Sequence, residues 1–246
     1  MLRVETVSKT FGGVEAVHRV SLNLAPREIL VVAGPAGSGK STLCDLVSGR
    51  HRPETGRILL DDTPITRLPV SGRACLGIAA RGRGDDAFST FTVFETLILA
   101  HEAAHRRCNR LAIGHPEAAE VAAYRALRAV GIEHRADVRT RDLDRDDRLL
   151  LELASALAAD ARLIVVDELF KGVGPALRDR LLQILVRAKR SRAILLGAHM
   201  LEPVMPVADR AMVLSAGRII AAGQPSEIAS LPVVRAAYLG DEVDHA

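Results

Sequence analysis

A glycine-rich segment that ends in a lysine and two hydroxyl residues is the part of the chain best suited to chemistry. The spacing matches G-x-x-x-x-G-K-[ST], in which the glycines let backbone N–H groups curl around phosphates and a helix N-terminus adds a favourable dipole. An apolar, strand-like run precedes the segment and a helix-like run follows it, so both flanks agree with the motif. A glycine-rich turn without a ligand is the simpler alternative. The segment consists of Gly34, Pro35, Ala36, Gly37, Ser38, Gly39, Lys40, Ser41 and Thr42.

Within this segment, Lys40 supplies a positive charge for phosphate oxygens and the Ser41 hydroxyl is placed to ligate Mg²⁺. The pattern therefore predicts that the chain binds a nucleoside triphosphate.

Two adjacent carboxylates, Asp167 and Glu168, end the apolar run at residues 163–166. A parallel strand of this kind carries its last residue to the sheet edge where open α/β folds bind ligands. There Asp167 would hold Mg²⁺, usually through water, and Glu168 would polarise an attacking water as a general base. The alternative is that both carboxylates cap the next helix.

A third feature is His199, which comes directly after the apolar run at residues 193–197. A histidine at such a strand end is suited to donate a hydrogen bond to a terminal phosphate. A single histidine is more often a surface residue or a satisfied core residue, so this prediction depends on the other two motifs.

Strands must alternate with helices to bring these residues together. Turn signals and apolar patterning predict short strands at residues 2–7, 20–24, 29–33, 57–60, 74–80, 163–166 and 193–197. Helical spacing predicts helices at 92–101, 117–130, 148–159 and 176–188, and a terminal hairpin at 212–214 and 218–221. This alternation indicates a parallel sheet with crossover helices, and the helices in the middle of the chain indicate an inserted helical subdomain.

The bulk composition excludes several classes of protein. Only 3% of the residues are aromatic, there is no Trp, and the net charge of +3 comes without a long basic block, which argues against a nucleic-acid partner. Three cysteines lack metal-ligand spacing, and their odd number suits a reducing compartment. Because we find neither a signal peptide nor an apolar run long enough for a membrane span, we expect a cytosolic protein whose membrane contact comes through a partner.

Taken together, these motifs resemble the ATPase subunits of ABC transporters, most closely the branched-chain amino-acid importer type. The resemblance covers nearly the whole chain and includes residues 11–17, 34–42, 48–58, 92–96, 151–154, 163–168, 208–210 and 233–240. It implies an α/β P-loop NTPase (RecA-like) fold, with a parallel sheet, an N-terminal antiparallel β part and an inserted helical subdomain. Residues 1–246 would form one ABC ATPase domain, with a nucleotide-binding core at 1–83 and 160–246 and a helical subdomain at about 84–159.

The resemblance also implies roles for single residues, with ATP and Mg²⁺ as cofactors. Phe11 falls where the family stacks an aromatic ring on the adenine, although an ordinary strand-edge core Phe is the alternative. Lys40, Glu168 and His199 fall on the catalytic positions, and His199 corresponds to the switch histidine. Ser41 and Asp167 would bind the metal. Residues 172–175 fall on the loop that touches the opposite subunit.

One family motif is altered in a way that changes its charge. The family places a serine and glycines, L-S-G-G-Q or a close relative, at a helix N-terminus that contacts the nucleotide of the other subunit. Counted back from Asp167 without a gap, residues 143–147 read LDRDD at this place. Asp144, with an acid three residues later, should still start a helix, while the phosphate contact is lost. An error in the register is the alternative.

A second altered motif is the loop after Ala80, where the family's glutamine position falls at Arg83. A guanidinium cannot ligate a metal, although it can pair with phosphate oxygens. A solvated loop charge is the alternative for Arg83.

These departures matter because family members work as head-to-tail dimers in which each ATP lies between two subunits. We expect a subunit of an ABC importer on the cytoplasmic face of the cell membrane, peripheral to permease subunits and indirectly served by a solute-binding protein. It would work as an asymmetric heterodimer with a second, intact ABC ATPase subunit, and the isolated chain would hydrolyse ATP poorly. The alternative is a structural or regulatory subunit that binds ATP without hydrolysing it. Branched-chain amino acids are the solute class suggested by the resemblance, and an ABC-type ATPase acting on DNA or ribosomes is a remote third alternative.

Overall fold

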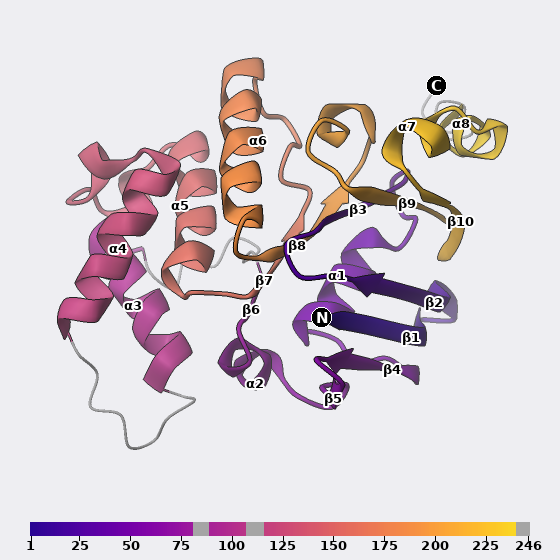
Figure 1. Ribbon diagram of the computed structural model, residues 1–246, viewed down its shortest axis with the longest axis horizontal. Coiled ribbons are helices and arrows are strands. Elements are labelled where there is room, and N and C mark those ends of the chain that lie inside the picture. The colour runs from indigo at the N-terminus through magenta and orange to yellow at the C-terminus, as the bar shows by residue number, and fades with distance from the viewer. Residues whose placement is uncertain (81–88, 107–115, 240–246) are drawn as a thin grey trace. The chain divides into compact units, whose positions relative to one another are not determined.

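The computed structural model describes residues 1–80, 89–106 and 116–239, and its backbone forms two compact units (Figure 1). The first unit contains Met1–Val70, Val165–Gly172 and the chain from Lys189 onward. The second unit contains Ser71–Ile164 and Val173–Ala188. Arg83 and residues 84–88, like Cys108, lie outside the described residues.

An antiparallel sheet forms the N-terminal part of the first unit. Its strands are β1 (Leu2–Phe11), β2 (Val14–Leu24), β4 (Thr55–Leu60) and β5 (Thr63–Pro64), in the order β2-β1-β4-β5. Gly12 and Gly13 join β1 to β2 with φ angles of 54° and 85°, and two consecutive positive φ angles are what a tight two-residue hairpin turn requires. Phe11 therefore lies at the tip of a hairpin, directly paired with Val14.

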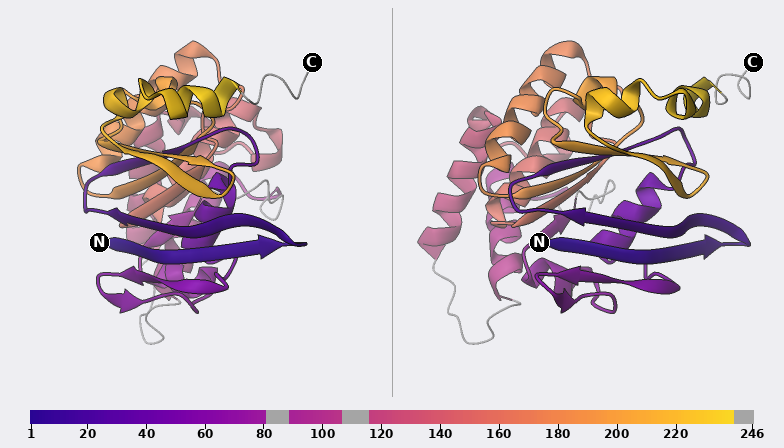
Figure 2. Two further views of the ribbon diagram at one scale, coloured as in Figure 1. Left: turned by 90° about the vertical axis from the view of Figure 1, so that its right-hand side faces the viewer. Right: turned by 45° about the vertical axis from the view of Figure 1, so that its right-hand side comes forward.

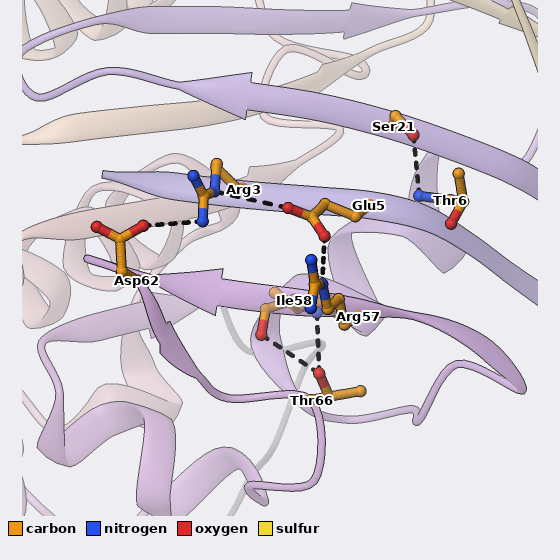
Figure 3. A network of polar contacts seen from close by, with 8 residues as sticks. All are labelled: Arg3, Glu5, Thr6, Ser21, Arg57, Ile58, Asp62 and Thr66. Atoms are coloured by element: carbon orange, nitrogen blue, oxygen red, sulfur yellow. Dashed lines mark hydrogen bonds and ion pairs between the residues drawn. The ribbon is translucent and has the colours of Figure 1, made fainter.

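Irregularities bend this hairpin, and serine hydroxyls satisfy the backbone groups that the irregularities release. Thr6 has a φ of 47° and its N–H donates to Ser21 Oγ at 2.9 Å, while Arg19 has a φ of 46° and its N–H donates to Ser8 Oγ at 2.9 Å. Figure 3 shows the Thr6–Ser21 contact between the two strands. Such paired bulges increase the twist of a strand pair without leaving donors unsatisfied.

Charged pairs connect neighbouring strands on the same sheet. The Glu5 carboxylate of β1 lies between Arg3 of its own strand and Arg57 of β4, and Arg3 also pairs with Asp62 at 2.8 Å (Figure 3). These pairs are exposed, so each stabilises the fold by at most about 1 kcal/mol. Glu5 and Arg57 are register partners in the antiparallel pairing of β1 with β4, as are Val4 and Ile58.

The second sheet of the first unit is mainly parallel. Its order is β10-β9-β3-β8-β7, formed by Arg218–Gly223, Arg210–Ser215, Ile29–Ala33, Ala193–Ala198 and the end of Leu163–Asp167. β3 is parallel to both β8 and β9, and all residues of β3 and β8 are buried. Continuous apolar strands of this kind are typical of parallel sheets covered on both faces.

Helices complete the first unit around this sheet. Helix α1 (Lys40–Ser48) follows β3 and buries Leu43, Leu46 and Val47. The C-terminal helices α7 (Pro225–Ala229) and α8 (Pro232–Leu239) pack on the β9–β10 hairpin, as Figure 2 shows. A short 3-10 helix, Glu202–Val204, follows β8.

The second unit is predominantly helical. Its helices are α2 (Val70–Cys75), α3 (Val93–Arg106), α4 (Pro116–Val130), α5 (Arg145–Ala158) and α6 (Pro175–Lys189). The unit includes α2 from Ser71 onward and α6 as far as Ala188. Short 3-10 helices lie at Glu133–Arg135 and Thr140–Asp142. Helices α3, α4 and α5 pack on one another, and Leu97, Leu127 and Leu150 of these helices are buried. The short strand β6 (Ile78–Ala80) lies beside the start of β7, where the Gly77 carbonyl accepts bonds from the N–H groups of Arg162 and Leu163.

Most predicted elements are confirmed, and one is partly wrong. Strands at 29–33, 163–166 and 193–197 and the helix at 176–188 appear with boundaries within one residue of those predicted. The helix predicted at 148–159 begins three residues earlier, at Arg145, and ends at Ala158. The strand predicted at 74–80 begins only at Ile78, because Val70–Cys75 forms a helix and Gly77, with a φ of 83°, separates the two. The run of small residues at 74–80 did not reveal that break.

Among the residues that the structure describes, no helix combines the length and the apolar character that crossing a membrane requires.

Candidate nucleotide-binding site

Three neighbouring strand ends in the first unit carry the predicted site residues. β3 ends at Ala33, before the glycine-rich loop; β8 ends at Ala198, before His199; and β7 ends at Asp167, before Glu168. Ala33 and Ala198 are register partners in the parallel pair of β3 and β8, and β7 is the next strand in the sheet. The sheet therefore brings the three motifs to one carboxyl edge, the edge at which open α/β sheets bind ligands.

The glycine-rich loop is anchored by backbone contacts from two other segments. Gly39 has a φ of 101°, and a Cβ at this position would lie 2.1 Å from the Ala16 carbonyl oxygen of β2, so only glycine fits. On another side, the Gly217 N–H donates to the Ser38 carbonyl at 3.1 Å, and the Gly217 carbonyl accepts from His18 N–H at 2.8 Å. The β9–β10 turn and β2 thus fix the loop where α1 begins.

Lys40 is held inside this loop. Its side chain is 4% exposed, and its ammonium donates to the Pro35 carbonyl at 2.6 Å and to the Ser38 hydroxyl at 3.2 Å. Lys40 is also the first residue of α1, so Ser41 and Thr42 follow in the first helical turn, where backbone N–H groups have no helical acceptors. A buried ammonium beside a helix N-terminus is an arrangement suited to a polyphosphate.

The end of β7 places the two carboxylates differently. Asp167 is half-buried, and a Cβ on Gly197 of β8 would lie 2.7 Å from Asp167 Oδ1. Gly197 therefore leaves the room that the Asp167 carboxylate occupies. This requirement comes from a close approach, since Gly197 does not have a positive φ.

Glu168 adopts a left-handed backbone conformation with a φ of 50°, which is uncommon for a residue with a side chain. Its N–H donates to the Gly197 carbonyl at 3.0 Å, and its carbonyl accepts from Lys171 N–H at 3.3 Å. The Lys171 ammonium also lies 3.3 Å from Glu168 Oε2. Strained backbone at a polar strand end is often found at functional sites.

His199 is exposed directly after β8, and its ring lies at an interplanar angle of 73° to that of Tyr238 of α8, with ring centroids 6.5 Å apart. Burial, with a smaller contribution from the negative charge of Glu202, raises the pKa of Tyr238 to about 12. The C-terminal helix thus contributes an aromatic neighbour to His199.

Phe11 lies in the same unit as the loop. Its side chain is 42% exposed at the hairpin tip, and the ring of His51 lies 5.1 Å away at an interplanar angle of 67°. β2, which starts beyond the turn, carries Ala16 against Gly39 of the loop. Only a few residues of β2 therefore separate the exposed Phe11 ring from Ala16, the residue of β2 that lies against the glycine-rich loop.

These residues fit a magnesium–nucleotide complex by their chemistry. In the described part of the chain, no cluster of three or more His, Cys, Asp or Glu residues is arranged to hold a metal by itself. Mg²⁺ typically takes one or two protein oxygens together with phosphate oxygens, and Ser41 and Asp167 would supply such oxygens. A bound nucleotide would contribute the phosphoanhydride bond, and the chain's own groups would hold the phosphates (Lys40 and the loop) and orient water (Glu168).

The LDRDD segment, residues 143–147, lies in the second unit and contains the start of α5. Asp144 is the N-cap of α5, and its Oδ1 accepts a hydrogen bond from Asp147 N–H at 2.7 Å. The predicted helix start is confirmed. The acid three residues later does not bond back to the cap: Asp147 Oδ2 pairs with Arg135 Nε at 2.8 Å instead.

Several supporting residues were not identified from the sequence. Gly197 and Gly217 position Asp167 and the loop, and their only sequence signals are a glycine that interrupts an apolar run and the turn Ser215-Ala216-Gly217. Arg135, the partner of Asp147, carried no signal, because its role depends on how the chain folds between α4 and α5.

Comparisons with known proteins agree with this geometry. A family model described as "ABC transporter" matches residues 17–171. The chain is 31% identical to the "Probable branched-chain amino acid transport ATP-binding protein LivG" of Archaeoglobus fulgidus, over 98% of this chain and 95% of that protein. It is also 31% identical to the "Lipopolysaccharide export system ATP-binding protein LptB" of Escherichia coli strain K12, over 98% of both chains.

Solved structures extend the similarity to the fold. The ADP conformation of MJ1267, an ATP-binding cassette of an ABC transporter, superposes with a TM-score of 0.86 at 26% identity, over 98% of each chain. A nucleotide-free ATP-binding cassette gives a TM-score of 0.85, also at 26% identity. The predicted α/β P-loop NTPase fold is thereby confirmed. The chain belongs to the ABC transporter family, as one of its ATP-binding subunits.

Proposed function

We propose that this chain is an ATP-binding subunit of an ABC importer that works asymmetrically beside a second, intact ATPase subunit. Both would be peripheral on the cytoplasmic face of the membrane, attached to permease subunits. Lys40, Ser41, Asp167, Glu168 and His199 would bind and hydrolyse one ATP, with Phe11 against the adenine. The family's use of dimers and permeases supports the assembly; the asymmetry is supported by this chain's own α5.

The observation that carries the asymmetry is the N-terminus of α5. A helix N-terminus attracts phosphate through its unpaired N–H groups. Here the carboxylate of Asp144 already accepts the Asp147 N–H, and Asp146 is a second exposed carboxylate in the same turn. In this proposal, the chain's own carboxylate takes the place of the phosphate that the family's serine and glycine motif would contact.

The negative charge of the aspartates adds to the effect of this occupied N–H group. Two unit charges about 4 Å apart repel by roughly 4 kcal/mol at an effective dielectric constant near 20. Arg135 neutralises Asp147, whose side chain is 13% exposed, but Asp144 and Asp146 face solvent. Arg145, which lies between them in the sequence, offsets part of the repulsion. A nucleotide held by another subunit would meet a net unfavourable surface.

Different dimers would then behave differently. A homodimer would set Asp144 and Asp146 against both nucleotides and would turn over slowly. A heterodimer would contain one competent site, made from this chain's Lys40, Asp167 and Glu168 together with the partner's intact serine and glycine motif. Its second site would combine the partner's phosphate loop with residues 143–147 of this chain and would bind ATP without efficient hydrolysis.

The importer assignment is supported by the LivG relative and by the tail at residues 233–240, which resembles the ending of that subfamily. The second candidate is an export-type subunit, favoured by the LptB relative at the same identity. Reconstitution with a permease in liposomes separates the two candidates. Stimulation of ATP turnover by a solute-loaded binding protein supports import. Turnover that no binding protein stimulates, together with movement of solute away from the cytoplasmic side, supports export.

A subunit that binds ATP without hydrolysing it remains the alternative mechanism. Glu168→Gln distinguishes it in a heterodimer with a candidate partner, because our proposal requires turnover to fall by about 10²-fold or more when the base is removed. Unchanged turnover would assign this chain a purely structural role.

The decisive experiment measures ATPase activity of the chain alone, of the partner alone and of their mixture. We expect the mixture to exceed the sum of its parts, and Lys40→Ala to abolish Mg-ATP binding by this chain. Rapid turnover by the chain alone, comparable to an intact family member, would refute the asymmetric proposal.

A further inference from the structure

The loop at residues 49–54, which we call the bracing loop, connects the end of α1 to β4 and contacts the tip of the β1–β2 hairpin. Its first half is bound to α1: the N–H groups of Gly49 and His51 both donate to the Asp45 carbonyl, at 3.0 and 3.2 Å. Arg50 pairs with the Asp45 carboxylate at 3.2 Å. The first half of the loop is therefore attached to α1, the helix that begins at Lys40.

Its last residue, Glu54, grips the hairpin just before Phe11. Glu54 Oε1 accepts from Thr10 N–H at 3.2 Å and from the Lys9 ammonium at 3.2 Å, and the Glu54 N–H donates to the Ser8 carbonyl at 2.8 Å. The backbone hydrogen bond from Thr10, followed by the bond from Lys9, lowers the pKa of Glu54 below its usual value of 4.5. Glu54 thus forms hydrogen bonds with three consecutive residues of β1, Ser8, Lys9 and Thr10.

Two side chains contact the Phe11 ring, one from the bracing loop and one from β1. The His51 ring meets it at a centroid distance of 5.1 Å in an edge-on arrangement, which is a favourable geometry for an aromatic pair. The Lys9 ammonium, fixed by Glu54, lies over the Phe11 ring at 5.2 Å from its centroid. Phe11 lies beyond Ser8, the last residue of β1 that pairs with β4, so these side-chain contacts restrict where the ring can lie.

We propose that His51 and Glu54 are positioning residues that preorganise Phe11 for the nucleobase and so set the affinity for the base without affecting the phosphate contacts. This inference rests on the proposed function, in which Phe11 contacts the adenine. Holding a contact group in its bound position lowers the conformational entropy lost on binding.

The test compares two probes by calorimetry on the full chain: Mg-ATP, which carries the base, and Mg-tripolyphosphate, which does not. We expect His51→Ala and Glu54→Ala each to weaken Mg-ATP binding by about three- to tenfold, the range that corresponds to roughly 0.7–1.4 kcal/mol. Tripolyphosphate binding should stay within about twofold of the wild type. His51→Phe should restore ATP affinity, because a phenyl ring retains the aromatic contact.

A matched control and a second readout make the outcome specific. Glu15→Ala removes a carboxylate of similar exposure from the same hairpin, and it should leave both affinities unchanged. Glu15 is the cross-strand partner of Thr10, but its carboxylate pairs with His18, whereas Lys9 pairs with Glu54. In the nucleotide-free chain, Glu54→Ala should speed hydrogen exchange of the Thr10 amide, since that N–H loses its acceptor.

Phe11→Ala separates the failure of this inference from the failure of the function beneath it. If Phe11→Ala leaves the ATP affinity unchanged, the base contact in the proposed function is wrong. If Phe11→Ala weakens ATP but not tripolyphosphate while His51→Ala and Glu54→Ala change neither, the positioning role is refuted. Equal weakening of both probes by His51→Ala or Glu54→Ala would also refute it, because the loop would then act on the phosphate site.

Discussion

Replacing Gly197 with alanine tests whether β8 makes room for the Asp167 carboxylate, which we propose binds the metal. The added Cβ would lie 2.7 Å from Asp167 Oδ1 and 3.5 Å from both Asp167 Cα and Cys44 Sγ. The last two distances are ordinary contacts, so the strain falls on the carboxylate. A side chain forced away from its rotamer costs about 0.5–1.5 kcal/mol, and overpacking of a buried strand costs about 1–3 kcal/mol.

These costs should weaken nucleotide binding in the presence of Mg²⁺ more than in its absence. We expect Gly197→Ala to weaken nucleotide binding about three- to tenfold in the presence of Mg²⁺ and to leave binding in excess chelator nearly unchanged, because the phosphate loop is not disturbed. Calorimetry of ADP with and without Mg²⁺ measures both values. Asp167→Asn should give the same pattern.

Gly174→Ala provides the matched control, because a Cβ there meets nothing within 4 Å and the residue does not have a positive φ. It should bind nucleotide like the wild type in both conditions. If Gly197→Ala binds Mg-ADP with wild-type affinity, or loses affinity equally with and without Mg²⁺, Asp167 does not act through the metal.

Three further predictions concern α5 and the C-terminal helix. Asp144→Ala should lower the free energy of unfolding by about 1 kcal/mol in urea denaturation, since it removes the cap of Asp147 N–H, whereas Asp144→Ser should change it by only a few tenths; equal effects would refute the cap. Arg135→Met should cost about 1–3 kcal/mol by leaving the largely buried Asp147 carboxylate unpaired, and Arg135→Lys should cost less; no loss in Arg135→Met would contradict that pairing. Because the pKa of Tyr238 is raised from 10.0 to about 12, the folded state favours the un-ionised phenol. The contribution of this preference to the free energy of unfolding is complete below pH 10 and is lost as the pH rises through about 12. Ultraviolet titration of the wild type against Tyr238→Phe checks this, and a Tyr238 step near the ordinary value would contradict it.

The sequence was most informative where a local pattern determines a local structure. The glycine-rich loop, its flanking strand and helix, and the strand ending in Asp167 each depend on residues within a short window, and all of these elements appear as predicted. The helix start at Asp144 follows the same logic, because an N-cap is a local interaction. The strand predicted at 74–80 failed because small apolar residues suit a short helix as well as a strand.

Contacts between distant segments could not be read from the sequence. The requirement for Gly197 arises only when β8 lies beside β7, and the anchoring of Ser38 by Gly217 requires the β9–β10 turn to reach the loop. The pairing of Asp147 with Arg135 likewise depends on the packing of α5 against the segment after α4. The left-handed backbone at Glu168 is a consequence of its bond to Gly197, which no propensity indicates.

The central claim is that the N-terminus of α5 carries its own anion and therefore cannot serve a phosphate. Its most direct test is steady-state ATP turnover by the isolated chain, compared with the triple variant Asp144→Ser, Arg145→Gly, Asp146→Gly, after thermal melts show that both are folded. We predict that the variant hydrolyses ATP at least about tenfold faster, because relief of roughly 1.4 kcal/mol of the repulsion suffices for that factor. Equal rates in two folded proteins, at the level of an intact family member, would contradict the claim.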